Sequence, residues 1–218
     1  METVVIFDMD GVLIDSQPLH YAIDMAVLKT CGLTATIDMV TPYTGVSNPD
    51  RWPQYKEKLG LRESVERLIE LQEMFMRETF NSDDLVAIEG IPELLQILKH
   101  MGIPRGVASS SSHELIEMVL ERINIKNYFD SIISGEDVKN GKPAPDIYLK
   151  AAKAFNLPPE NCIAIEDSPM GILSAKNAGM TCIAYRNPST HGQVFTHADY
   201  VIDKYSEVSS IVKGRLKR

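Results

Sequence analysis

Two aspartates separated by a single residue follow a short apolar run near the start of the chain. The stretch reads VVIFDMDGVLIDS over residues 4–16, with Asp8 and Asp10 directly before Gly11. Two carboxylates in one pocket raise each other's pKa unless a positive charge lies between them. An aspartate at the end of a strand is also a common helix N-cap. The pair alone therefore indicates either a cation site or ordinary capping.

Other polar residues occur at corresponding places along the chain. Ser109 and Ser110 end the apolar run GVAS, and Glu166 and Asp167 end the run CIAI. Lys142 lies in the connecting segment GEDVKNGKPAPD. Each feature alone fits turn, capping or solvated-loop chemistry. Because ligands bind outside the carboxyl ends of parallel strands, we expect these residues to gather at one edge of a sheet.

Four carboxylates at one sheet edge require a cation. Hard oxygen ligands beside an anionic substrate favour Mg²⁺, and no His or Cys cluster in the sequence suits a softer metal. A carboxylate there is able to attack phosphorus and form an aspartyl phosphate. A second acid two residues away is able to protonate the leaving group, while Ser109 and Lys142 offer donors and charge to the phosphoryl oxygens. The pattern therefore predicts phosphoryl transfer.

The elements that must position these residues form an alternating pattern of strands and helices. Six short apolar runs predict buried strands, at residues 4–7, 106–109, 131–133, 162–165, 181–185 and 199–202. Segments with helical periodicity separate most of them. We therefore expect an α/β fold, with a Rossmann-like parallel sheet covered by helices on both faces.

Capping signals predict where several helices begin and end. Ser111 followed by Glu114 is typical of a capping box. Ser168 and Pro169 indicate an N-cap and a first helical residue, and Gly179 the end of that helix. Pro145 predicts the first helical residue after the lysine-bearing segment.

Residues 16–85 interrupt the alternation, because they show helical patterning without a strand. One long amphipathic helix is expected over residues 61–76. We predict an inserted helical cap domain at 16–85 and a core domain formed by 1–15 and 86–218. Trp52 and Tyr55 are expected either to face the substrate or to form the core of this cap.

Composition limits the possible partners and location. The formal net charge of −8 argues against non-specific binding to nucleic acid or to anionic membranes. The three cysteines, Cys31, Cys162 and Cys182, cannot all pair and have no close ligand spacing, which is typical of reduced thiols. No apolar run approaches the length of a membrane span. We expect a cytoplasmic monomer that acts on a small phosphorylated substrate.

The motifs DMDGVLIDS, VASS, GKPAPDIYL and IEDSPMGI, in this order, resemble the four motifs of the haloacid dehalogenase-like superfamily. The resemblance extends over essentially the whole chain and is greatest to β-phosphoglucomutases and sugar-phosphate phosphatases. It implies that Asp8 is the nucleophile and Asp10 the general acid and base. Ser109 and Lys142 would bind the transferring phosphoryl group.

The same resemblance implies a Mg²⁺ site. Its ligands would be Asp8, the backbone carbonyl of Asp10, and Asp167, with Glu166 close by or acting through water. The set of expected substrate-binding residues is Gly11, His20, Asn48, Ser109, Ser110 and Lys142.

Two reactions are open within this branch, since phosphatases pass the phosphoryl group to water and mutases return it to the sugar. His20 matches a histidine of the mutases. The mutases also carry an arginine in a GVSR-type loop, where this chain reads TGVSNPD and has Asn48. Arg51 is a possible replacement for that arginine. We favour the phosphatase, with the mutase as the alternative.

The non-enzymatic alternative is a phospho-acceptor signalling domain of the receiver type. Such domains also combine an acidic Mg²⁺ pocket with a hydroxyl residue and a lysine. Asp10 and the helical insert favour an enzyme, because a receiver needs neither an acid for turnover nor a cap.

Overall fold

The computed structural model describes residues 2–43, 48–190 and 194–216. The chain forms two compact units. The core unit comprises Met1–Asp15 and Asp83–Arg218, and the cap unit comprises Ser16–Ser82. The division predicted from the sequence, at 16–85, placed the return to the core three residues later than this.

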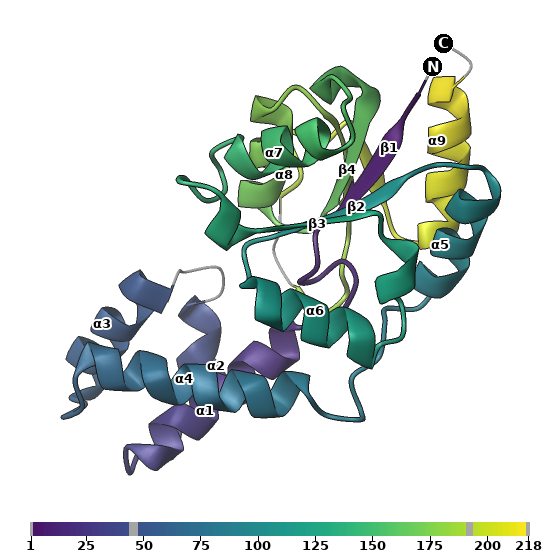
Figure 1. Ribbon diagram of the computed structural model, residues 1–218. Coiled ribbons are helices and arrows are strands. Elements are labelled where there is room, and N and C mark those ends of the chain that lie inside the picture. The colour runs from purple at the N-terminus through teal and green to yellow at the C-terminus, as the bar shows by residue number, and fades with distance from the viewer. Residues whose placement is uncertain (1, 44–47, 191–193, 217–218) are drawn as a thin grey trace. The chain divides into compact units, whose positions relative to one another are not determined.

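The core unit contains a parallel sheet of six strands in the order β3-β2-β1-β4-β5-β6 (Figure 1). The strands are β1 (Val4–Phe7), β2 (Arg105–Ser109), β3 (Ser131–Ser134), β4 (Cys162–Glu166), β5 (Thr181–Tyr185) and β6 (Tyr200–Ile202). All six predicted strands are confirmed. The order is that of a Rossmann-like sheet, in which the strand order reverses between β1 and β4.

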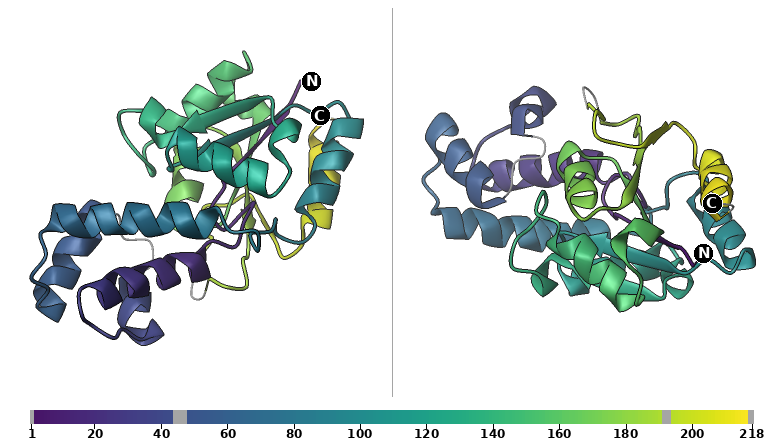
Figure 2. Two further views of the ribbon diagram at one scale, coloured as in Figure 1. Left: turned by 60° about the horizontal axis from the view of Figure 1, so that its bottom comes forward. Right: turned by 90° about the horizontal axis from the view of Figure 1, so that it is seen from above.

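Helices cover both faces of the sheet, which confirms the predicted fold class. The core helices are α5 (Ile91–His100), α6 (His113–Arg122), α7 (Asp146–Ala154), α8 (Pro169–Asn177) and α9 (Val208–Leu216). In Figures 1 and 2, α7 and α8 lie on one side of the sheet, and α5 and α9 lie on the other. Burial on both faces explains why the central strands are continuous apolar runs.

Alternate residues of β1 illustrate this two-sided burial. Val4 and Ile6 pack in one apolar cluster with Tyr148 of α7 and Ile172 of α8. Successive strand residues point to opposite faces, so Val5 belongs to the other side, where it is also fully buried. The sheet is therefore a rigid platform whose strand ends hold the polar residues.

Helix starts follow local capping, with two corrections to the expected residues. Ser112, and not Ser111, is the N-cap of α6, because its side chain accepts a hydrogen bond from the backbone of Leu115. Pro145 is the N-cap of α7 rather than its first residue. Ser168 caps α8 as predicted, and its side chain accepts from the backbone of Gly171.

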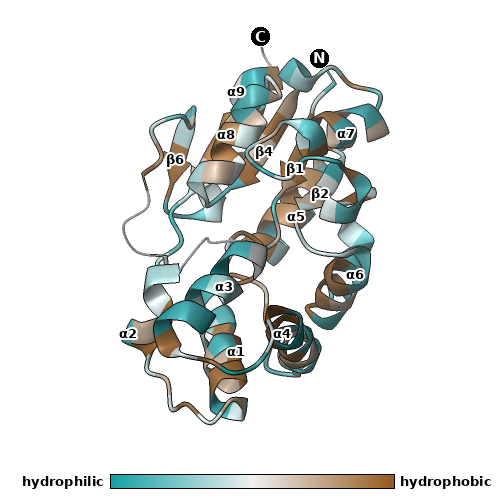
Figure 3. Cartoon of the chain, turned by 90° about the vertical axis from the view of Figure 1, so that its left-hand side faces the viewer, coloured by the Kyte–Doolittle hydropathy of each residue, from teal (hydrophilic) through white to brown (hydrophobic). Residues whose placement is uncertain are grey.

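The cap unit is entirely helical within its described residues. Its helices are α1 (Gln17–Thr30), α2 (Ile37–Val40), α3 (Asn48–Leu59) and α4 (Val65–Phe80). The predicted long helix starts later than expected, because Gly60 has a positive φ of 66° and Ser64 supplies the N-cap. Figure 3 shows α4 nearly end-on, with apolar residues in brown and polar residues in teal.

Aromatic side chains form the interior of the cap unit. Trp52 and Tyr55 are fully buried and belong to an apolar cluster with Leu68 and Leu71 of α4. The indole of Trp52 donates to the side-chain oxygen of Gln72 at 2.6 Å. These two aromatic residues therefore belong to the cap core. Across the part of the chain that the structure describes, no helix has the length and apolarity needed to cross a membrane.

Candidate active site

The candidate site lies where the strand order of the sheet reverses. The backbone N–H of Asp8 donates to the carbonyl of Ile165 at 3.0 Å, which continues the pairing of β1 with β4 beyond Phe7. This register places Asp8 beside Glu166. In open sheets of this kind, ligands bind outside the carboxyl ends of the strands at such a reversal. The sequence prediction of one polar edge is therefore borne out for the ends of β1 and β4.

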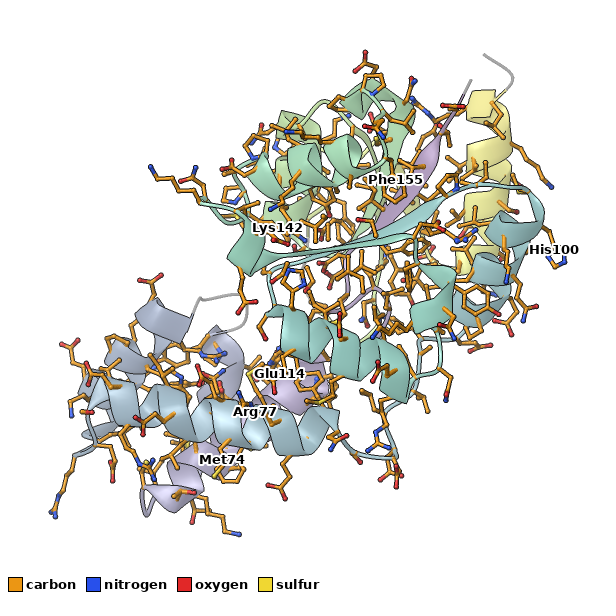
Figure 4. The ribbon with its side chains drawn as sticks, in the orientation of Figure 1. Met74, Arg77, His100, Glu114, Lys142 and Phe155 are labelled. Carbon is orange, nitrogen blue, oxygen red and sulfur yellow. The ribbon has the colours of Figure 1, made fainter. Side chains whose placement is uncertain are left out.

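Lys142 connects these two strand ends. Its Nζ lies 2.7 Å from Oδ1 of Asp8 and 2.6 Å from Oε1 of Glu166, and it also donates to the carbonyl of Ala108 at 3.2 Å. Figure 4 labels Lys142 on the segment that precedes α7. Its side chain is 9% exposed. A lysine ammonium has three donors, and each of them has a partner here.

The carboxylate of Glu166 is fully buried and held by several donors. Oε1 accepts from Lys142 and from the hydroxyl of Tyr148, the latter at 2.7 Å. Oε2 accepts from the backbone N–H of Asp167 at 3.2 Å and from the hydroxyl of Ser168 at 3.3 Å. Both oxygens of this buried carboxylate are therefore satisfied by hydrogen-bond donors.

Burial and mutual repulsion dominate the electrostatics of the site. Burial raises the pKa of Asp8 to about 8, with further increases from Glu166 and Asp10, although Lys142 opposes them. Burial and the neighbouring carboxylates likewise raise the pKa of Asp167. Burial acts to lower the pKa of Lys142, but Asp8 and Glu166 raise it overall. One ammonium therefore does not neutralise the cluster, and a further cation would relieve the repulsion.

The donor set fits Mg²⁺. Carboxylate oxygens of Asp8, Glu166 and Asp167 lie within 4.8 Å of one another. All are hard oxygen donors, which Mg²⁺ prefers. Space for the carboxylates comes from two glycines, since a Cβ on Gly11 would overlap the carboxyl group of Asp167 and one on Gly171 would overlap that of Glu166.

Gly11 also lets the chain turn directly after Asp10. Its φ of 76° lies in the left-handed region, which favours glycine. Its N–H donates to the carbonyl of Ile14, and its carbonyl accepts from the side chain of Asn187. Both backbone groups are therefore engaged within the core unit, and the missing Cβ makes room for Asp167. The expected contact of Gly11 with the substrate stays a prediction.

Four consecutive serines, from the last residue of β2 to the N-cap of α6, connect these two elements. Ser109 is fully buried, and its hydroxyl oxygen accepts from the backbone N–H of Ser111 at 3.2 Å. Ser110 is exposed. The hydroxyl of Ser111 donates to Oδ2 of Asp10 at 3.3 Å, so the structure adds Ser111 to the surroundings of the expected acid.

The expected substrate residues of the cap unit are described only in part. His20 lies in α1, and its ring centroid is 5.6 Å from that of Phe80. Asn48 begins α3, but its side chain lies outside the described residues. Arg51 is 8% exposed and pairs with Asp24, with Nη2 and Oδ1 3.3 Å apart. The charge of Arg51 is thus matched inside the cap unit.

Comparison with known families agrees with this geometry. The family model described as haloacid dehalogenase-like hydrolase matches residues 5–185. The chain belongs to the haloacid dehalogenase-like hydrolase family. This assignment confirms the resemblance carried by the four motifs. It also argues against the receiver-type alternative, because relatives of this chain are named phosphatases.

Several relatives and solved structures resemble this haloacid dehalogenase-like hydrolase. A phosphorylated carbohydrates phosphatase of Thermotoga maritima is 34% identical over 176 residues, covering 81% of each chain. Hexitol phosphatase B of Escherichia coli is 29% identical and covers 94% of this chain and 93% of its own. The crystal structure of a putative β-phosphoglucomutase from Thermotoga maritima has a TM-score of 0.83 and 30% identity, over 98% of this chain and 99% of that one.

Three residues of the site in this haloacid dehalogenase-like hydrolase were missed from the sequence. Tyr148 fits the apolar periodicity of α7, so nothing in its spacing distinguishes it from a core residue. Ser111 was assigned to capping. Gly171 resembles any glycine in a helix, and only the position of the Glu166 carboxylate reveals its role.

Gly171→Ala should weaken binding of a divalent cation at the acidic cluster, measured with Mg²⁺, and should slow catalysis, because the added methyl group overlaps the buried Glu166 carboxylate. We expect a loss of about 10-fold or more in Mg²⁺ affinity and in kcat/KM. Gly214→Ala is the matched control, since Gly214 is also helical and a Cβ there meets nothing within 4 Å. The control should gain about 0.5–1 kcal/mol of stability with unchanged kinetics. Wild-type Mg²⁺ affinity in Gly171→Ala would contradict this role.

Proposed function

We propose that this hydrolase is a Mg²⁺-dependent phosphatase that hydrolyses a small phosphorylated metabolite, a sugar phosphate, through an aspartyl-phosphate intermediate. The observation that carries the proposal is the ammonium of Lys142 held between Asp8 and Glu166 at the reversal of the strand order. That arrangement combines a nucleophilic carboxylate with positive charge for the phosphoryl oxygens. The relatives named as carbohydrate and hexitol phosphatases support the substrate class.

The Mg²⁺ site would use the same carboxylates. Asp8, Asp167 and the backbone carbonyl of Asp10 would hold the ion, with Glu166 acting directly or through water. Bound Mg²⁺ supplies positive charge that offsets the carboxylates and the phosphoryl oxygens.

The chemistry divides between two aspartates. In the first step, the carboxylate of Asp8 attacks phosphorus and the bond from phosphorus to the sugar oxygen breaks. The carboxylic acid of Asp10 gives its proton to that departing oxygen. In the second step, Asp10 takes a proton from water, whose oxygen attacks phosphorus. Inorganic phosphate leaves, and the Asp8 carboxylate is restored.

Phosphoryl oxygens are bound by Lys142, Ser109 and the N-terminal end of α6. The hydroxyl of Ser109 and nearby backbone N–H groups act as donors, and the ammonium of Lys142 exchanges one of its present partners for a phosphoryl oxygen. Its longest contact, 3.2 Å to the carbonyl of Ala108, is the one that costs least to replace.

A phosphosugar mutase is the second candidate, favoured by the similarity to a putative β-phosphoglucomutase. A mutase must retain an intermediate that carries two phosphates, which requires a cation for the second one. Arg51 is buried and paired with Asp24, so it is a poor replacement for a phosphate-binding arginine. This pairing supports the phosphatase.

A panel assay of phosphate release tests the proposal. We expect hydrolysis of sugar phosphates with kcat/KM of at least about 10⁴ M⁻¹ s⁻¹ in Mg²⁺, lower rates on nucleotides and phospho-acids, and none after chelation. Conversion of β-glucose 1-phosphate to glucose 6-phosphate is followed in parallel. Efficient conversion without phosphate release would establish the mutase instead. No turnover of any ester would refute both.

A further inference from the structure

Tyr148 of α7 contacts two charged residues of the candidate site, Glu166 and Lys142. Its hydroxyl donates to Oε1 of Glu166 at 2.7 Å. The centroid of its ring is 5.2 Å from Nζ of Lys142. Tyr148 is fully buried. One side chain therefore contacts both partners of the ion pair between Lys142 and Glu166.

The hydroxyl contact shares an acceptor with the lysine. Oε1 of Glu166 receives both the ammonium of Lys142 and the hydroxyl of Tyr148. A neutral donor on that oxygen takes up part of its negative charge, which weakens its attraction for the ammonium. Lys142 then remains shared between Glu166 and Asp8 and does not collapse onto Glu166.

The aromatic ring of Tyr148 also attracts the ammonium of Lys142. An ammonium within about 6 Å of a ring centroid is attracted to the face of the ring, more strongly when water is excluded. Lys142 is buried, so this attraction is little screened. The segment that carries Lys142 is also held by α8, since Ser174 donates to the carbonyl of Ala144 at 2.6 Å and Asn177 to that of Pro143 at 3.1 Å.

We infer that Tyr148 is a positioning residue that fixes the Glu166 carboxylate through its hydroxyl and the Lys142 ammonium through its ring. It touches neither the substrate nor the metal in this role and acts through those two residues. The inference deepens the proposed function and rests on it for the catalytic consequence. The consequence for Mg²⁺ binding is independent of turnover.

Two substitutions separate the contacts. Tyr148→Phe removes the hydroxyl and keeps the ring, so we expect Mg²⁺ affinity and kcat to fall about 10-fold, with KM within about twofold of wild type. Tyr148→Leu removes both contacts, and kcat should fall about 100-fold. Mg²⁺ affinity is measured by calorimetry without substrate, and binding of inorganic phosphate is measured the same way at saturating Mg²⁺.

Tyr205→Phe is the matched control for loss of a buried hydroxyl. Tyr205 is 2% exposed, and its hydroxyl donates to the carbonyl of Val12 at 2.6 Å. We expect Tyr205→Phe and Tyr148→Phe to lose similar stability in urea, about 1 kcal/mol each. Only Tyr148→Phe should lose Mg²⁺ affinity.

The outcomes distinguish a failure of the positioning role of Tyr148 from a failure of the proposed function. Mg²⁺ affinity and kcat in Tyr148→Phe within twofold of wild type would overturn the inference, as would equal losses of Mg²⁺ affinity in both Phe variants. If wild type hydrolyses no phosphate ester but Tyr148→Phe alone binds Mg²⁺ more weakly, the proposed function fails and the positioning role stands.

Discussion

Asp8→Asn should lower turnover on the best substrate by at least about 10,000-fold while the protein stays folded. An amide does not attack phosphorus, so the covalent step is lost. Stability measurements separate this effect from misfolding. Burial raises the pKa of Asp8 from 3.8 to about 8, so in the metal-free protein this carboxyl group costs folding stability that accumulates as the pH rises from about 4 to about 8. The uncharged variant avoids this cost.

Urea unfolding in chelator checks the stability part of this prediction. Wild type should lose stability relative to Asp8→Asn from about pH 4 to about pH 8 and then level off, because over that range the unfolded state has lost the Asp8 proton while the folded state still holds it. Turnover is measured at saturating Mg²⁺ with the substrate that the panel assay identifies. Substantial remaining turnover in Asp8→Asn would exclude Asp8 as the nucleophile.

Asp10→Asn is the informative comparison, because it keeps the nucleophile and removes the proposed acid and base. We expect this variant to accept a phosphoryl group from acetyl phosphate, whose leaving group needs little protonation, and then to lose it slowly. The phosphorylated protein should be visible by mass spectrometry after acid quenching. Asp8→Asn should show no such adduct under the same conditions.

The strands and the polar edge of the core could be predicted because their signals are local. Each central strand is buried on both faces and is therefore a continuous apolar run, as in Val4–Phe7 and Thr181–Tyr185. Parallel strands bring their carboxyl ends to one edge. That rule alone predicts that Asp8 and Glu166 come close together, which the 2.7 Å and 2.6 Å contacts to Lys142 bear out.

Other features depend on contacts that no local pattern encodes. Ser111 and Ser112 are identical as capping residues, and only the backbone geometry selects Ser112. The pairing of Arg51 with Asp24 joins α3 to α1 across 27 residues of chain. In the sequence, Arg51 was a possible phosphate-binding residue, whereas in the folded cap unit its charge is paired with Asp24.

Lys142→Met should damage both activity and the stability of the metal-free protein. The ammonium is the only charged donor that the described structure places on both Asp8 and Glu166. Removing one partner of a buried ion pair typically costs about 3–5 kcal/mol, because the other charge is left uncompensated. We expect a loss of that order at neutral pH and a fall in kcat of about 1,000-fold, since the phosphoryl oxygens lose their cation.

Mg²⁺ should reverse the two losses unequally, because it replaces the missing charge among the carboxylates but not the donor to the phosphoryl group. Saturating Mg²⁺ should therefore restore more stability to Lys142→Met than it adds to wild type, while kcat stays low. Lys176→Met is the control, since Lys176 pairs with Asp199 at 2.7 Å in a partly exposed site and should cost about 0–1 kcal/mol without affecting kcat. A Lys142→Met variant with kcat within tenfold of wild type would show that the carboxylates and metal suffice for catalysis.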